Sequence, residues 1–243
     1  MKTSPSTPTQ SLLVLTAILS SFLWAAAARS ADPEHLYWAS LEAANVAPQN
    51  NTYDSSPSYV HWAGVGGYSS YENRSKCASF LTSVLMQSYG WTSTDFKTWM
   101  SSTSPTADKY YAAINQQNGF SIVGNVSNIL PGDVIAIMYP SGSTVTGHVM
   151  VAGSVATPRT SSSPVIEGTY QYEIQVIDSS QSGHGPTDTR LKGDGTWQPG
   201  AGIGVSRLYV DSSGALVGYT WSTYGNSQFY DLATRPIIVG RLL

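Results

Sequence analysis

The chain of 243 residues contains a single cysteine, Cys77, which therefore cannot form an intrachain disulfide or a multi-cysteine zinc site. The apolar residues of the segment Lys76 to Tyr89 recur on one face and predict a helix, with Ser75 as its cap and Gly90 at its end. Cys77 would be the second residue of this helix, where unpaired backbone N–H groups favour a thiolate. Cys77 is thus either a reactive nucleophile or a small buried hydrophobe.

A thiol nucleophile needs a base, and the chain offers four histidines. His148 opens a predicted strand at 148–155, directly after a polar loop, so one side of its ring is expected to face a cleft. His35 is expected on the surface of an N-terminal helix, and His61 lies in an aromatic loop. His184 lies in a polar stretch and is the second choice for a site residue.

A carboxylate can complete the set, because it fixes the tautomer of the imidazole and stabilises the imidazolium. The next predicted strand, 172–178, ends at Asp178. If the two strands form an antiparallel hairpin in which Val155 pairs with Tyr172, His148 faces residue 179. Asp178 then lies beside His148. The alternative is that Asp178 only begins a turn, which is common for aspartate.

The elements that position these residues change type along the chain. Helices are predicted first and strands afterwards, which indicates an α+β domain with N-terminal helices packed on an antiparallel sheet. The predicted helices are 32–46, 76–89, 93–100 and 107–117, and the predicted strands are 133–139, 148–155, 172–178, 204–210, 216–221 and 236–242.

Residues 1–28 have the layout of a signal peptide: Lys2 near the start, an uncharged apolar run and an alanine-rich end. The other interpretation, a membrane anchor, requires a longer apolar run. Residues 29–243 would then form one α+β domain with extra C-terminal strands. We expect a secreted or periplasmic protein without a membrane span after cleavage.

The composition and the motifs indicate which classes of ligand the protein binds. Charged residues make up 11% of the chain and the net charge is -3, without a basic block, which argues against nucleic acid as a partner. The sequence contains no phosphate-binding glycine loop and no metal motif, so we expect no cofactor and no metal. Trp62, Tyr68 and Tyr71 precede Cys77 in a loop expected to line a cleft, so they are predicted, with His184, to bind substrate; aromatics of this kind also stabilise exported sheet proteins.

Three motifs carry a resemblance to the NlpC-type and CHAP-type cell-wall peptidases: Lys76-Cys77-Ala78-Ser79-Phe80, Leu130-Pro131-Gly132-Asp133-Val134 and Gly147-His148-Val149-Met150-Val151. The resemblance covers roughly residues 59–180. It implies a papain-like cysteine peptidase core, with Cys77 as nucleophile, His148 as base and Asp178 as orienting residue. It also implies hydrolysis of peptide or amide bonds in peptidoglycan stem peptides. Two alternatives stay open: a catalytically silent cell-wall binding module of the same fold, and an acyl transferase or transamidase.

The small-residue pair Ala26 and Ala28 predicts cleavage after Ala28 and a mature N-terminus at Arg29. The intact mass of protein recovered from the periplasm or the medium should correspond to residues 29–243. A full-length product retained in the membrane would contradict the export signal.

Overall fold

The computed structural model describes Met1 and residues 32–243. Residues 2–28 of the predicted signal peptide and the expected cleavage point before Arg29 lie outside the described residues. Residues 32–243 form one compact unit. Among the described residues, no helix has both the length and the hydropathy needed to cross a bilayer.

Four α-helices and two short 3-10 helices lie mainly in the first half of this unit. The helices are α1 (Glu34–Asn45), η1 (Pro48–Asn50), α2 (Cys77–Tyr89), α3 (Ser93–Met100), α4 (Ala107–Asn115) and η2 (Val126–Asn128). The strands are β1 (Asn51–Thr52), β2 (Tyr59–His61), β3 (Glu72–Arg74), β4 (Phe120–Ile122), β5 (Val134–Met138), β6 (Gly147–Ala152), β7 (Thr157–Pro158), β8 (Tyr170–Ser180), β9 (Gly200–Val210), β10 (Leu216–Thr220), β11 (Phe229–Asp231) and β12 (Ile237–Leu242).

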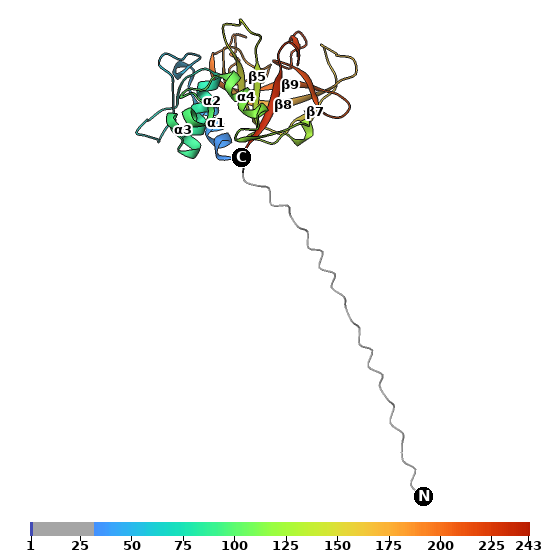
Figure 1. Ribbon diagram of the computed structural model, residues 1–243, viewed down its shortest axis with the longest axis horizontal. Coiled ribbons are helices and arrows are strands. Elements are labelled where there is room, and N and C mark those ends of the chain that lie inside the picture. Colours follow the sequence, from blue (N-terminus) through green and yellow to red (C-terminus); the bar gives the residue numbers. More distant parts are fainter. Residues whose placement is uncertain (2–31) are drawn as a thin grey trace. The chain divides into compact units, whose positions relative to one another are not determined.

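A nine-stranded sheet dominates the fold, in the order β11-β10-β9-β8-β6-β5-β12-β4, with β7 added beside β8. All its strand pairs are antiparallel. Figure 1 shows α1, α2 and α3 gathered on one side of the molecule, and α1 and α2 pack against the large sheet at β6 and β8. The expected α+β class with a mostly antiparallel sheet is therefore confirmed. A small sheet, β1-β3-β2, was not predicted, and its β1-β3 pair is parallel.

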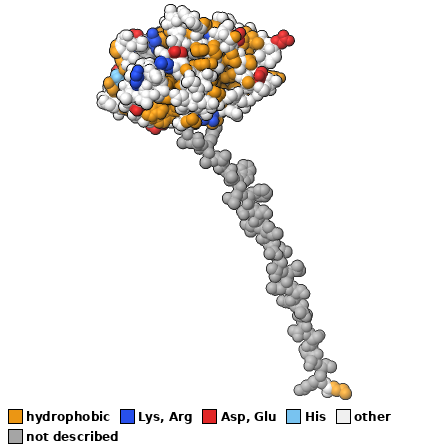
Figure 2. All heavy atoms as spheres, in the orientation of Figure 1, with side chains coloured by type: hydrophobic (Ala, Val, Ile, Leu, Met, Phe, Trp, Pro, Cys, Tyr) orange, Lys and Arg blue, Asp and Glu red, His pale blue; other side chains and the backbone are white. Residues whose placement is uncertain are grey.

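The large sheet buries side chains on both faces. On β5, Val134 and Ala136 pack with the helices, whereas Ile135 and Ile137 belong to a second cluster on the opposite face. This alternation follows from the two-residue period of a strand. Charged side chains are sparse on the face drawn in Figure 2.

Helix α2 is the central helix of the core. Phe80, Leu81, Val84 and Leu85 are fully buried on the face that the periodicity predicted. Burial of each such side chain contributes roughly 1.5–3 kcal/mol. The helix begins one residue later than expected, so that Cys77 is its first residue. Its cap is Lys76 and not Ser75; the Lys76 backbone N–H donates to Ser79 Oγ at 2.9 Å.

Ser75 instead joins a buried polar network that fixes the chain just before Cys77. Its hydroxyl donates to the Asn73 side chain, whose amide group donates to Asn51 Oδ1 at 2.9 Å. Ser179 Oγ on β8 donates to the Ser75 carbonyl at 2.7 Å. The start of α2 is thereby attached to the strand that carries Asp178.

The expected pairing of Val155 with Tyr172 is wrong. Val155 lies beyond the end of β6, and Tyr172 pairs with Pro158 of β7. The β6-β8 ladder consists of Val151↔Ile177 and Ala152↔Val176, and it ends before His148. Ala152 pairs with Val176, and Thr157 pairs with Glu173. The chain advances five residues between these pairs on one side and three on β8, so the segment between β6 and β7 bulges out of the ladder.

Helix α1 buries a carboxyl group that has no visible partner. Glu42 is fully buried, and neither of its carboxyl oxygens has a hydrogen-bond partner among the described residues. Burial, with a smaller contribution from the negative charge of Glu72, raises the pKa of Glu42 to about 8. The folded protein therefore holds a proton on Glu42 at pH values where the unfolded chain has released it.

Between about pH 5 and pH 8 this difference lowers the stability of the wild type as pH rises, by an amount on the order of a few kcal/mol. Glu42→Gln keeps the shape of the protonated side chain but cannot ionise. Its urea midpoint should fall less than that of the wild type between pH 5 and pH 8. The control is Glu34→Gln, an exposed position on the same helix; equal pH dependence of Glu42→Gln and wild type would contradict the assignment.

Candidate active site

Cys77 lies both on the core face of α2 and at the edge of a cleft. It is 5% exposed and packs within the helix-side core, yet it also lines a cavity of about 310 Å³. The first residue of a helix can pack in the core and also line a cleft, because no further turn of the helix covers its N-terminal side. The cleft is lined by Tyr53, Ser55, Lys76, Cys77, Ala78, Ser79, Ser104, Pro105, Thr106, Ala107, Thr144, Val145, Thr146 and Gly147.

The thiol of Cys77 interacts directly with the imidazole of His148. Burial raises the pKa of Cys77, but the charge and hydrogen bond of His148, with a hydrogen bond from the Val149 backbone, bring it below its ordinary value. Burial lowers the pKa of His148, but the charge of Cys77 and the hydrogen bond to Asp178 raise it to about 9. The imidazolium of His148 therefore favours the thiolate of Cys77, and the thiolate favours the imidazolium.

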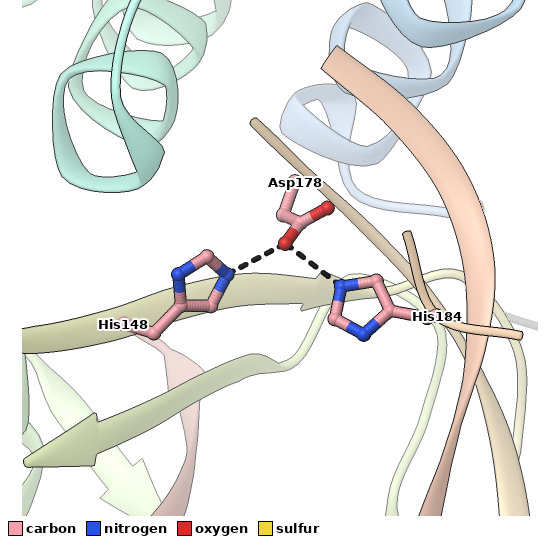
Figure 3. A group of neighbouring side chains, drawn as sticks. All are labelled: His148, Asp178 and His184. Atoms are coloured by element: carbon pink, nitrogen blue, oxygen red, sulfur yellow. Dashed lines mark hydrogen bonds and ion pairs between the residues drawn. The ribbon is translucent and has the colours of Figure 1, made fainter. Parts of the chain in front are cut away.

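Asp178 holds the far side of the His148 ring. His148 Nε2 lies 2.6 Å from Asp178 Oδ2, and both side chains are buried (Figure 3). Since a carboxylate accepts, Nε2 carries the hydrogen, which leaves Nδ1 for the thiol. The expected contact between His148 and Asp178 is present, although the register used to predict it is wrong. It forms beyond the end of the β6-β8 ladder, across the space between the two diverging strands.

Two further side chains, His184 and Arg190, face the same carboxylate. His184 Nε2 lies 2.9 Å from Asp178 Oδ2, and Arg190 Nη1 lies 2.8 Å from Oδ1 in an ion pair that lacks the alignment of a hydrogen bond. Burial raises the pKa of Asp178, but the charges of Arg190 and His184 and the hydrogen bonds of both histidines hold it well below its ordinary value. The carboxylate is therefore ionised at any working pH.

Trp221, just after β10, covers the two histidines. Its ring centroid lies 4.7 Å from that of His148 and 4.3 Å from that of His184. An aromatic ring in this position keeps water away from the hydrogen bonds to Asp178 and interacts favourably with a positively charged imidazole.

His148, Asp178 and His184 are also residue types that bind metals, and their ligand atoms lie within 4.8 Å of one another. Both histidine nitrogens, however, contact the carboxylate at hydrogen-bond distance, and Arg190 already compensates its charge. This is the geometry of a hydrogen-bond network with protons between the ligand atoms, and not of three ligands directed at a common point.

Tyr53 is a site residue that the sequence did not single out. It lines the cleft, and its hydroxyl interacts with the Cys77 thiol; burial, mainly, and the nearby negative charges raise its pKa, so the hydroxyl keeps its proton. A phenol hydroxyl and the backbone N–H of Cys77, which has no acceptor within the helix, are suitable donors for an oxyanion. No spacing rule connects Tyr53 with Cys77, because Tyr53 lies in an irregular loop.

The predicted substrate-binding aromatics lie elsewhere. Trp62 is buried, and its indole N–H donates to the Trp38 carbonyl at 2.9 Å. Tyr68 is exposed and stacks on His61, and Tyr71 packs against the core. None of the three lines the cleft of Cys77, because the segment they occupy forms β2, β3 and the turns between them.

Two expectations for histidines are also corrected. His184 is fully buried behind Asp178, so it does not face the cleft as a substrate contact. His35, expected on the surface, is 2% exposed and bonds to the Tyr89 hydroxyl at 2.7 Å and the Gly132 carbonyl at 2.6 Å. Periodicity alone could not reveal this, because both partners lie far away in the sequence.

Comparisons with known proteins give one informative relative. No family model matches the chain, and no solved structure matches it. The chain is 32% identical over 225 residues to the uncharacterized protein R653 of Acanthamoeba polyphaga mimivirus, covering 88% of this chain and 98% of the viral protein. The chain belongs to the family of this viral protein. The match therefore spans nearly the whole viral protein.

Asp178 should be a stability residue as well as a site residue. Asp178→Ala leaves buried Arg190 without one of its two carboxylate partners and both histidines without their acceptor, which we expect to lower the free energy of unfolding by roughly 3–5 kcal/mol. Asp178→Asn should be milder, because its amide oxygen still accepts from one histidine. Urea unfolding measures both.

The matched control is Asp194→Ala, which removes an exposed loop carboxylate and should leave the midpoint close to that of the wild type. Equal midpoints for Asp178→Ala and Asp194→Ala would show that the buried network does not depend on this carboxylate.

Proposed function

We propose that the protein is a secreted cysteine hydrolase that cleaves peptide or amide bonds, with Cys77, His148 and Asp178 as its catalytic triad. The observation that carries the proposal is the chain of contacts from the Cys77 thiol through the His148 ring to the Asp178 carboxylate, placed at a cleft. Nucleophile, base and orienting group each have the partner that thiol catalysis requires.

In the proposed reaction the Cys77 thiolate attacks the carbonyl carbon of the scissile bond. The His148 imidazolium gives its Nδ1 proton to the departing amine, and a thioester remains on Cys77. His148, now neutral, takes a proton from a water molecule, the resulting hydroxide attacks the thioester, and the acid product leaves. The Cys77 thiolate and the His148 imidazolium are then restored.

The developing oxyanion needs donors close to the sulfur. The backbone N–H of Cys77 at the start of α2 and the Tyr53 hydroxyl are the two groups suited to this role. Both are fixed before substrate arrives, the first by the helix and the second by the packing that buries it.

The order of the elements supports a papain-like core. The cysteine is on the first turn of a buried helix, the histidine on a strand of the sheet, and the acid on the strand paired with it. This is the arrangement that the resemblance to NlpC-type and CHAP-type peptidases implies. The extra strands β9 to β12 continue the same sheet.

Peptidoglycan stem peptides are the substrate we propose, in line with that resemblance and with the predicted export. The cleft suits a polar peptide, because most of its polar lining side chains carry hydroxyl groups and Lys76 is the charged residue among them. Its volume is at the small end for ligand pockets, which suits a short peptide better than a folded protein.

Alkylation and hydrolysis together test the proposal. At pH 6 iodoacetamide should modify wild-type Cys77 roughly 10- to 100-fold faster than it modifies Cys77 in His148→Ala, because a thiolate reacts and a thiol does not. Cys77→Ala should abolish release of fragments from a muropeptide mixture while the protein stays folded. His61→Ala, a histidine outside the cleft, is the control and should keep wild-type rates.

The results separate the alternatives. A wild-type Cys77 that is inert at pH 6, together with tight muropeptide binding, would favour the silent binding module. Fragments that appear joined to an added amine acceptor, and not as free acids, would favour a transamidase. Wild-type turnover in Cys77→Ala would end the enzyme proposal.

A further inference from the structure

The hydrogen bonds of the proposed triad continue past Asp178 to His184. His184 comes from the segment between β8 and β9, and its Nε2 meets the same Asp178 oxygen that His148 contacts (Figure 3). The His184 side chain is fully buried and has no access to the cleft. It can therefore act on the reaction only through its neighbours, and Asp178 is the one that is hydrogen-bonded to both histidines.

Both ring nitrogens of His184 face acceptors. Nδ1 lies 2.7 Å from the Trp221 carbonyl oxygen, and Nε2 lies 2.9 Å from the ionised carboxylate of Asp178. A carbonyl and a carboxylate can only accept, so both nitrogens must carry hydrogen for both bonds to form. The imidazolium is the form that satisfies the site. Ser206 Oγ lies 3.2 Å from both His184 Nδ1 and the Trp221 carbonyl oxygen. Because the carbonyl lies closer to Nδ1, at 2.7 Å, it takes the Nδ1 hydrogen, and the Ser206 hydroxyl donates to the same carbonyl.

Two more charged groups complete the surroundings of His184. Asp188 accepts the His184 backbone N–H at 2.7 Å and holds Arg190 through both carboxylate oxygens, at 2.9 and 2.8 Å. Arg190 in turn reaches Asp178 Oδ1. Arg190 thus joins the Asp178 and Asp188 carboxylates, one on each side of its guanidinium group.

Strand β9 is shaped to admit this network. Gly202 is paired with Asp178, and a Cβ on it would lie 2.5 Å from Arg190 Nε. A Cβ on Gly204 would lie 2.1 Å from Asp188 Oδ2 and 2.8 Å from His184 Cβ. Any larger residue at these two positions would displace the charged groups that surround Asp178.

We propose that His184 is a positioning residue: it carries hydrogen on both ring nitrogens and, together with Arg190, keeps Asp178 ionised and turned toward His148. This inference rests on the proposed function and adds a fourth member to the hydrogen-bond chain. It also reverses the expectation from sequence that His184 contacts substrate.

A positive charge behind Asp178 has a defined effect on the two reacting groups. The charge stabilises the Cys77 thiolate and destabilises the His148 imidazolium, so it lowers the pKa of both groups. Its removal therefore raises both pKa values: the thiolate forms at higher pH, and the imidazolium persists to higher pH. Both limbs of a pH profile then move upward. Loosened packing alone has no reason to move both limbs in the same direction.

The test is the pH profile of Cys77 alkylation by iodoacetamide in His184→Gln, which keeps one donor but not the charge. We expect the pH at which alkylation begins to rise by roughly one unit. We expect the pH above which muropeptide hydrolysis declines to rise by roughly the same amount. Arg190→Gln should shift them in the same direction. His35→Gln, which removes a buried histidine with two hydrogen bonds remote from the cleft, is the matched control and should leave both limbs in place.

A second measurement needs no variant and no substrate. In the side-chain nitrogen NMR spectrum of the wild type at pH 7, His184 should have hydrogen on both ring nitrogens. A bare nitrogen on His184, or unshifted limbs in a folded His184→Gln, would overturn the proposal. If Cys77 proves inert and hydrolysis is absent, the proposed function fails, and the NMR result alone then decides whether His184 is the cation that holds Asp178.

Discussion

The carboxylate of Asp178 is a buried anion, and burial of an unpaired charge costs several kcal/mol. The surrounding chain compensates it on every side. His148 and His184 donate to one oxygen and Arg190 faces the other. These partners come from β6 and from the segment that follows β8, so the positions of several chain segments depend on one charge. The orientation of His148, and through it the ionisation of Cys77, follows from this arrangement.

The site depends both on the apolar packing of helix α2 and on the electrostatic environment of the first residue of that helix. Helix α2 is held by apolar side chains such as Phe80 and Leu85, which fix the direction of its axis. The first residue of that helix, Cys77, then lies where the helix end favours negative charge. The polar network from Ser75 to Ser179 ties this point to β8. Packing thus places the sulfur, and hydrogen bonds place the groups that act on it.

The sequence predicted features that depend on local pattern. The apolar period of residues 76–89 identified α2, and the alternation in β5, β8 and β9 identified the main strands, with small errors at their ends. The contact between His148 and Asp178 was also expected, though from a wrong register, because no pattern reveals the bulge between Ala152 and Thr157. Tyr53, Arg190 and Trp221 were missed, since each reaches the site from an irregular segment. The alternating glycines at 200, 202 and 204 were the one available signal for the buried network.

The long sequence separation of these contacts has a consequence for biosynthesis. Asn51, close before α2, bonds to Ala201 across 150 positions, and His184 bonds to Trp221. Contacts so distant along the chain form late in folding. Cys77 is therefore synthesised before the strands that complete its surroundings. The proposed activity would therefore depend on the folding of the C-terminal third, which supplies Asp178, His184 and Arg190.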